Sequence, residues 1–148
     1  MGLGTVSLDH EDLAKVSRLF EALDAEGRHA LLSSSTHRLC IDGEVICREG
    51  EIGDDIYVIA SGEVRVTADD LGQEKELSIL RAGTFFGEMA ALNGQRRTAT
   101  VTALGDVELV VFPFAAVQVV LRDHPRAKEV LAQAGIQRTE ETMQKLME

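Results

Sequence analysis

Near the start of the chain, apolar residues recur every three or four positions, which is the spacing of one face of an amphipathic helix. The residues that carry this pattern are Leu13, Val16, Leu19, Phe20 and Leu23. Asp9 is predicted to cap this helix, because a short carboxylate there accepts the free backbone N–H groups of the first turn. A break at residues 24–27 is predicted to precede a second short helix around Leu31, which makes residues 8–35 an N-terminal helical zone.

From residue 36 to residue 112 the pattern changes to short runs in which alternate residues are apolar. The alternation is clearest at residues 56–60, 64–68 and 107–111. A period of two, with glycine-containing turns between the runs, predicts antiparallel strands in a sandwich or jelly roll. Gly62 and Gly83 are predicted to need a positive φ or a close backbone approach.

The helical pattern returns over residues 113–148. Pro113 suits the first turn of a helix that runs to about Asp123, and Pro125 is expected to open the last helix. Gly135 is a weak point inside that helix, because glycine is a poor helix former. An apolar stripe on the last helix is predicted to pack on the sheet or on a second copy of the chain. Its members are Ala132, Ile136, Met143 and Met147.

Composition and charge exclude several classes of function. The net charge is −10 with a pI near 4.8 and no basic stripe, so neither nucleic acid nor an anionic membrane is an expected partner. The sequence shows no apolar run long enough to span a bilayer and no signal peptide. We therefore expect a cytoplasmic protein, with residues 1–148 forming one domain.

Cysteine and histidine give little evidence of metal or redox chemistry. Cys40 and Cys47 flank an apparent turn, where a disulfide is geometrically conceivable, but we favour two reduced and buried thiols. The four histidines are scattered and lack ligand spacing, so no metal site is predicted.

Residues 83–101 carry the chemistry. Residues 88–92 are predicted to form a single helical turn, and the N-terminus of a helix holds anions through unpaired N–H groups and its dipole. Gly87 lets the backbone approach closely, and Arg97 offers a planar fork to two phosphate oxygens. The segment from Phe86 to Ala90, followed by residues 97–99, is therefore predicted to cradle a phosphate group.

Glu88 restricts the class of phosphate-containing ligand that the site can hold. A carboxylate beside a phosphate repels it, unless the carboxylate accepts a hydrogen bond from a neighbouring sugar hydroxyl while Arg97 neutralises the phosphate. A ribose cyclic phosphate presents both groups close together. The chain lacks the Gly-x-x-x-x-Gly-Lys-Ser/Thr loop that is typical of ATP sites.

Several motifs of this chain, taken in order, resemble the cyclic nucleotide-binding domain family. That family is shared by catabolite-activator-type bacterial regulators, kinase regulatory subunits and cyclic-nucleotide-gated channels. The similar segments are residues 19–23, 43–46, 49–54, 57–59, 61–64, 86–90 and 97–101.

The resemblance implies a mainly β fold with flanking helices. It comprises an eight-stranded antiparallel β-roll, or jelly roll, over residues 36–112. N-terminal helices, a short phosphate-binding helix and two C-terminal helices over residues 113–148 complete the fold, and the C-terminal helices act as a lid.

The resemblance also implies roles for individual residues. Glu88 would hold the ribose 2′-hydroxyl, and Arg97 would pair with the cyclic phosphate. Backbone groups would complete the cradle; these belong to Gly87, Met89, Ala90, Thr98 and Ala99. The apolar wall of the pocket would comprise Val64, Leu77 and Phe86.

Three residues leave alternatives open. Many family members have proline before the phosphate arginine, whereas this chain has Arg96, which we expect to be solvated although it could compete for the phosphate. Thr98 could meet the guanine of cGMP or merely bind the phosphate, and we favour cAMP over cGMP. Arg138 is either a lid arginine that caps the base or a solvated helix residue.

The predicted function is a non-enzymatic sensor of a cyclic nucleotide, with no cofactor, that signals to a protein partner or effector domain through its C-terminal helices. No residues follow the predicted last helix that would build a DNA-binding domain or a channel pore, so we expect a free-standing module or a fragment of a larger protein. Whether two copies of the chain form a homodimer is left open. The alternative is a ligand-free β-roll that serves as an interaction or dimerisation scaffold. A cupin-type enzyme is disfavoured, because the histidines do not cluster.

Overall fold

The computed structural model describes residues 21–53, 55–87 and 96–147, without the side chains of residues 134–140 and 142. Asp9 and most of the first predicted helix lie outside these residues. The helices are α3 (Ala25–Ser33), α5 (Phe114–Arg122) and α6 (Pro125–Met147). The strands are β1 (Thr36–Cys40), β2 (Val45–Cys47), β3 (Ile56–Asp70), β4 (Gln73–Arg81), β5 (Phe85–Phe86) and β6 (Thr100–Phe112).

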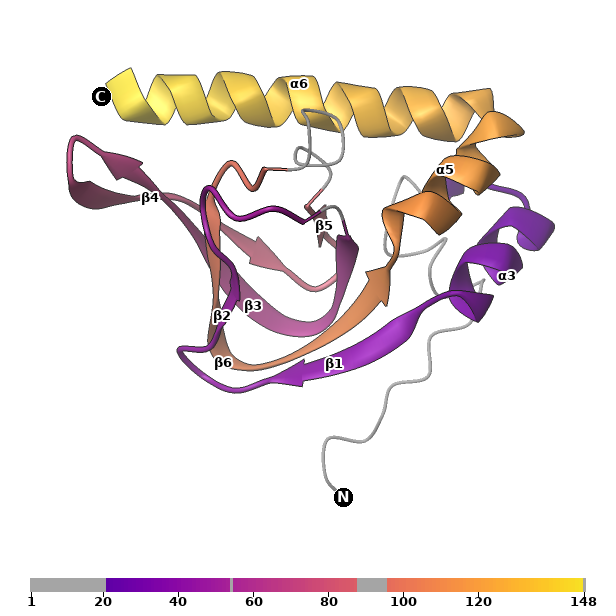
Figure 1. Ribbon diagram of the computed structural model, residues 1–148, viewed down its shortest axis with the longest axis horizontal. Helices are drawn as coiled ribbons and strands as arrows, with labels where there is room; N and C mark the ends of the chain where they lie inside the picture. The colour runs from indigo at the N-terminus through magenta and orange to yellow at the C-terminus, as the bar shows by residue number, and fades with distance from the viewer. Residues whose placement is uncertain (1–20, 54, 88–95, 148) are drawn as a thin grey trace.

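All pairings in the sheet are antiparallel, and two long strands form its backbone. β3 and β6 pair over most of their length, from Ile56 opposite Phe112 to Thr67 opposite Thr100. The order is β1-β6-β3-β4, with β2 paired to β6 and β5 paired to β3. Figure 1 shows β3 and β6 curving together around the interior of a roll. The predicted mainly β architecture with flanking helices is confirmed.

The strand count differs from the expected eight for a physical reason. The described residues contain six strands, because β3 and β6 each continue through a bend. The first half of β3 pairs with β5 and the second half with β4, while the two halves of β6 pair with β2 and β1. Four short strands and two halves of each long strand occupy the eight positions of the predicted roll.

Gly62 makes the bend in β3 possible. Its φ is +90°, and a Cβ at this position would lie 2.4 Å from the carbonyl oxygen of Asp106. The β3–β6 register shifts on both sides of Ser61. The predicted need for glycine at this position is therefore confirmed, and Gly83 also has a positive φ of +94°.

Alternation along β3 builds two cores rather than one apolar and one polar face. Tyr57 and Ile59 are buried inside the roll. Ile56 and Val58 are buried on the outer face, where they pack with side chains of α3, α5 and α6. Complete burial of each such aliphatic side chain stabilises the fold by about 1.5–3 kcal/mol.

The predicted break is present but lies earlier, at residues 22–24 instead of 24–27. Helix α3 begins at Ala25, and the carboxylate of Asp24 caps it by accepting the N–H of Gly27 at 2.7 Å. A good N-cap lets the helix start directly after the aspartate and pass through the glycine. The boundaries predicted around Pro113 and Pro125 agree with α5 and α6 to within one residue.

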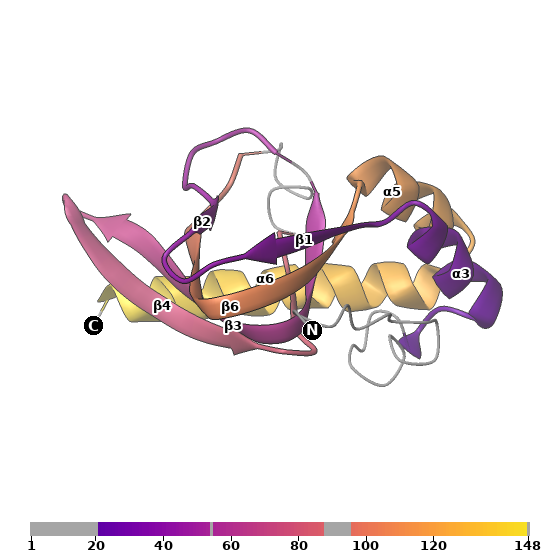
Figure 2. The same ribbon diagram turned by 90° about the horizontal axis from the view of Figure 1, so that it is seen from below.

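Helix α6 runs along the roll from α5 toward β4, which it contacts (Figures 1 and 2). Ala127 and Leu131 are the residues that anchor it in the outer core. The stripe predicted to pack on the sheet does not do so where it is described. Ala132 is exposed, and Met143 and Met147 are 59% and 83% exposed, respectively. Ala132, Met143 and Met147 therefore face solvent in the single chain, whereas Leu146, also in the last turns of the helix, is half-buried.

Candidate functional site

Arg97 is a buried cation, with only 8% of its surface exposed. Its backbone N–H donates to the carbonyl of Glu51 at 2.7 Å, and its carbonyl accepts from the N–H of Gly50 at 2.8 Å. These two bonds fix the arginine against the loop that follows β2.

The hydrogen bonds that the guanidinium of Arg97 donates to the described residues go to backbone carbonyls. Nη1 donates to the carbonyl of Asp55 at 3.2 Å and approaches that of Gly87 at 3.4 Å. The ion pairs found among the described residues involve other cations, namely Arg38, Arg65, Arg81 and His124. A buried charge is costly unless an opposite charge balances it. Within the described part of the chain, Arg97 is therefore suited to receive an anion.

Two glycines allow the chain to enclose the guanidinium. A Cβ at Gly53 would lie 3.1 Å from both Nε and Nη2 of Arg97. A Cβ at Gly87 would lie 2.9 Å from Nη1 and 2.5 Å from the carbonyl oxygen of Asp55, and the φ of Gly87 is +95°. The close backbone approach predicted at Gly87 is made toward the arginine.

An aromatic pair lies beside the guanidinium. The Cζ atom of Arg97 is 5.5 Å from the centroid of the Tyr57 ring. That ring stacks on Phe86, with the centroids 4.8 Å apart and the planes 13° from parallel. Burial raises the pKa of the Tyr57 phenol and of the neighbouring Cys47 thiol, so both groups are neutral near pH 7. Cys40 and Cys47 are both free and buried, as predicted.

The structure brings some of the predicted site residues together. Arg97, Gly87 and Phe86 meet around Tyr57, and Val64 belongs to the same interior cluster. Thr98 is exposed and Ala99 is half-buried, directly after the arginine.

The remaining predicted site residues are placed elsewhere or lie outside the described residues. Leu77 is half-buried at a bulge of β4, and Leu80, which pairs with Val64, packs on the interior cluster instead. The bulge inserts one residue, so the alternation in β4 cannot be read directly from the sequence. Glu88, Met89 and Ala90 lie outside the described residues, as does the side chain of Arg138 on α6.

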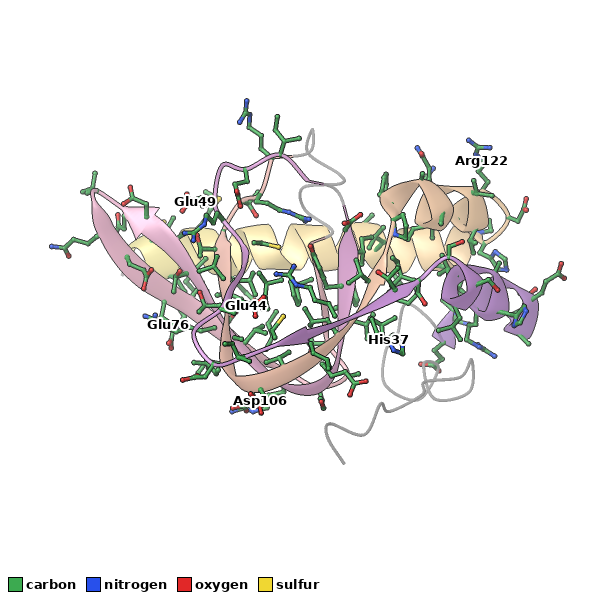
Figure 3. The ribbon with its side chains drawn as sticks, turned by 60° about the horizontal axis from the view of Figure 1, so that its bottom comes forward. His37, Glu44, Glu49, Glu76, Asp106 and Arg122 are labelled. Carbon is green, nitrogen blue, oxygen red and sulfur yellow. The ribbon has the colours of Figure 1, made fainter. Side chains whose placement is uncertain are left out.

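Arg96 differs from its neighbour. It is exposed, and its Nη1 donates to the carbonyl of Gly50 at 2.9 Å. Other charged side chains of the roll, such as Glu76 and Asp106, also lie on its outer surface (Figure 3). The expectation that Arg96 is solvated is confirmed.

The sequence pattern did not reveal three parts of this site. Tyr57, Gly53 and the carbonyl of Asp55 all contact the guanidinium. An available signal was the position of Tyr57, which alternates with Ile56 and Val58 and therefore lies on the opposite face of the strand, the face that turns into the roll. Its contact with Arg97, 40 positions later, depends on the tertiary fold.

In the part of the chain that the structure describes, no group of three or more His, Cys, Asp or Glu side chains is arranged to hold a metal ion. Among these residues, no helix combines the length and apolar character needed to cross a bilayer.

Comparison with known proteins identifies the family. The model of the cyclic nucleotide-binding domain matches residues 41–124, more than half of the chain. Mouse cyclic nucleotide-gated channel alpha-4 is 31% identical over 136 residues, which cover 88% of this chain and 23% of the channel. A cyclic nucleotide-gated potassium channel of Rhizobium etli is 33% identical over 120 residues, covering 81% of this chain and 32% of the channel.

A solved structure supports the same assignment. The catabolite activator protein of Thermus thermophilus is 33% identical, with a TM-score of 0.75, over 86% of this chain and 61% of that chain. This chain belongs to the cyclic nucleotide-binding domain family. Domains of this family are regulatory rather than catalytic, and the cyclic nucleotide is their ligand, not a cofactor. The chain spans between 17% and 32% of the length of the curated channels it matches.

Proposed function

We propose that this chain is a cyclic nucleotide sensor in which Arg97 pairs with the cyclic phosphate. The observation that supports this is the environment of the guanidinium: it is buried, enclosed by Gly53 and Gly87, and no carboxylate of the described residues balances it. A phosphate would supply the missing negative charge and accept the remaining N–H donors.

The other site residues follow from this placement. Phe86 and Val64 form the apolar floor near the arginine, and the N–H groups that follow Gly87 complete the cradle. Glu88 holds the ribose hydroxyl, while Met89, Ala90, Thr98 and Ala99 contribute backbone groups. Arg138 remains the proposed partner of the base from α6.

We favour cAMP over cGMP as the ligand. Thr98 directly follows the phosphate arginine. A hydrogen bond from its hydroxyl to the phosphate would explain this threonine without any contact to a guanine base. Recognition of a base is expected instead from the lid, because α6 extends along the roll (Figure 1).

Signalling is proposed to pass through α6. The helix is anchored by Ala127 and Leu131 near α5 and reaches β4 with its later turns. Ligand that contacts both the roll and the later turns would bias the position of the helix, which a protein partner, an effector domain or a second copy then reads. Such a partner and the sensor would meet in the cytoplasm.

Calorimetric titration with cAMP and with cGMP, side by side on the same preparation, tests the proposal. We expect both ligands to bind at one site per chain, with cAMP the tighter. Tighter binding of cGMP would overturn the choice of base. No binding of either ligand would overturn the sensor function and favour the scaffold alternative.

A further inference from the structure

Tyr57 lies against the guanidinium of Arg97 but has no assigned part in ligand recognition. We propose that Tyr57 is a positioning residue, whose ring holds Arg97 in the orientation that receives the cyclic phosphate. This inference rests on the proposed function, and it adds to the site a residue of β3 that lies inside the roll.

The ring of Tyr57 is itself held in place. Tyr57 on β3 pairs with Phe86 on β5 in the sheet register, and the two rings stack at 4.8 Å. Both residues are buried inside the roll. On its hydroxyl side the phenol contacts the Cys47 thiol. A ring fixed in this way presents a constant face to its neighbours.

Among the described residues, the hydrogen bonds of the guanidinium fix it at one end, while Gly53 lies close to Nε and Nη2 at the other. The two carbonyl acceptors, from Asp55 and Gly87, both bind Nη1 and so hold only one corner of the group. A planar cation 5.5 Å from a ring centroid is attracted by the ring quadrupole. This attraction restrains the orientation of the guanidinium, and a fork held in one orientation binds two phosphate oxygens with less reordering.

A purely structural role for Tyr57 makes different predictions. If Tyr57 only fills the core, its removal affects stability and affects binding regardless of the residue at position 97. If it positions Arg97, the ring matters only when the arginine is present, and the hydroxyl matters little. A double-mutant cycle between Tyr57 and Arg97 separates these cases.

The test compares four variants with the wild type: Tyr57→Phe, Tyr57→Leu, Arg97→Ala and the Tyr57→Leu/Arg97→Ala double variant. We expect Tyr57→Phe to keep the affinity for cAMP within about 2-fold and Tyr57→Leu to lose about 5- to 30-fold, the range of a desolvated cation–π contact. In the Arg97→Ala background, Tyr57→Leu is expected to change the affinity less than about 2-fold. An equal loss in both backgrounds, or a Phe variant as weak as the Leu variant, overturns the proposal.

Ile59→Val serves as the matched control for lost core volume. Ile59 is fully buried in the same cluster, two residues further along β3, and the contacts of the guanidinium within the described structure do not include it. We expect this variant to lower the denaturation midpoint while leaving the affinity for cAMP within about 2-fold. A loss in Ile59→Val as large as that in Tyr57→Leu would show that the site responds to any core defect.

A measurement without ligand keeps the two proposals distinguishable. The Nε–H resonance of Arg97, assigned by its absence in Arg97→Ala, is expected to show a ring-current shift that survives in Tyr57→Phe and disappears in Tyr57→Leu. A shift that persists in Tyr57→Leu overturns the positioning role. Absence of cAMP binding in wild type with a normal ring-current shift would contradict the proposed function while the contact itself stands.

Discussion

Arg96 and Arg97 are adjacent and chemically identical, yet their surroundings differ sharply. Arg96 is exposed and bonded to one carbonyl, whereas Arg97 is enclosed by two glycines and an aromatic ring. Because electrostatic interactions and hydrogen bonds strengthen where water is excluded, only the buried guanidinium can hold a phosphate strongly. The two residues therefore form a natural matched pair.

Arg97→Ala is expected to weaken cAMP binding by roughly 2–5 kcal/mol, about 30- to 4,000-fold in Kd, because a buried phosphate would lose its counter-charge. Calorimetry at constant ionic strength measures the change. Arg96→Ala removes the same charge from the exposed neighbour and is expected to change Kd less than about 3-fold. Equal effects of the two substitutions would show that only overall charge matters and would contradict the site assignment.

Glu108 is a second buried charged residue, away from Arg97. It lies on β6 opposite Leu39 of β1 and Ser61 of β3, and it is only 2% exposed. Its Oε1 has no hydrogen-bond partner among the described residues. An unsatisfied buried polar atom destabilises the fold by about 1–3 kcal/mol.

Glu108→Leu is therefore expected to raise the free energy of unfolding by about 1–3 kcal/mol, because it removes the unsatisfied oxygen and keeps a similar volume. Urea denaturation measures the midpoint. The control is Asp106→Asn at an exposed position of the same strand, which is expected to shift stability by less than about 0.5 kcal/mol (Figure 3). A Glu108→Leu variant less stable than wild type would mean that the carboxylate has a stabilising role.

At the scale of single residues, the sequence predicted those site residues whose role follows from a short local motif. Arg97 and Gly87 belong to one short motif, so their residue types and spacing were enough to indicate a phosphate site. Tyr57 and Gly53 join that site only because β3 and the loop before it fold against a segment 40 or more positions away. Contacts of that kind follow from topology, not from local pattern.

Between elements, a single histidine connects the N-terminal and C-terminal helices. His124, at the junction of α5 and α6, places Nε2 3.1 Å from the Asp24 carboxylate and Nδ1 2.8 Å from the carbonyl of Val120. Both neighbours are acceptors, so both ring nitrogens can donate only when the imidazole is protonated. The Val120 carbonyl, followed by Asp24 and Asp123, raises the pKa of His124 above its ordinary 6.5 despite partial desolvation.

This connection makes stability depend on pH. A raised histidine pKa contributes stability that is fully present below about 6.5 and is lost as pH rises through the folded-state pKa. The N–H of Gly27, then His124, lowers the pKa of Asp24 below 3.8, so that contribution is present above 3.8 and lost as pH falls further. Arg28 also faces this carboxylate and acts in the same direction.

His124→Gln is expected to remove the part of the stability that is lost as the pH rises above about 6.5. Urea midpoints at pH 6, 7 and 8 measure the difference between wild type and variant, which should be largest at pH 6. His29→Gln, an exposed histidine on α3, serves as the control and should keep the wild-type pH profile. A constant difference at all three pH values would contradict the role of the protonated imidazole.

At the scale of helices and strands, some sequence patterns predicted the structure better than others. Proline marked the starts of α5 and α6, because its fixed φ suits the first turn of a helix, where its missing N–H costs no hydrogen bond. The strand count was harder to anticipate, since nothing local shows whether a glycine such as Gly62 ends a strand or bends it. The apolar stripe at Met143 and Met147 predicted burial, but helix α6 passes beyond the core before it reaches them.

For the molecule as a whole, the contrast between the two ends of α6 determines which part of the helix would respond to ligand binding. Ala127 and Leu131 tie its first turns to the outer core, while Met143 and Met147 near its end are exposed. Local opening is easier where few apolar groups are buried. We therefore expect a stable first part and a less stable second part, which begins beyond Leu131 and lies along the roll (Figure 2).

Amide hydrogen exchange over residues 125–147, with and without saturating cAMP, tests whether this second part acts as the lid. We expect protection to rise beyond Leu131, because ligand would favour the docked arrangement, and to stay unchanged in the first turns, which are already anchored. Arg97→Ala at the same cAMP concentration is expected to show little change, which excludes a nonspecific effect of the nucleotide. Unchanged protection of the second part in saturated wild type would contradict signalling through α6, and a uniform rise across the whole helix would indicate global stabilisation instead of lid closure.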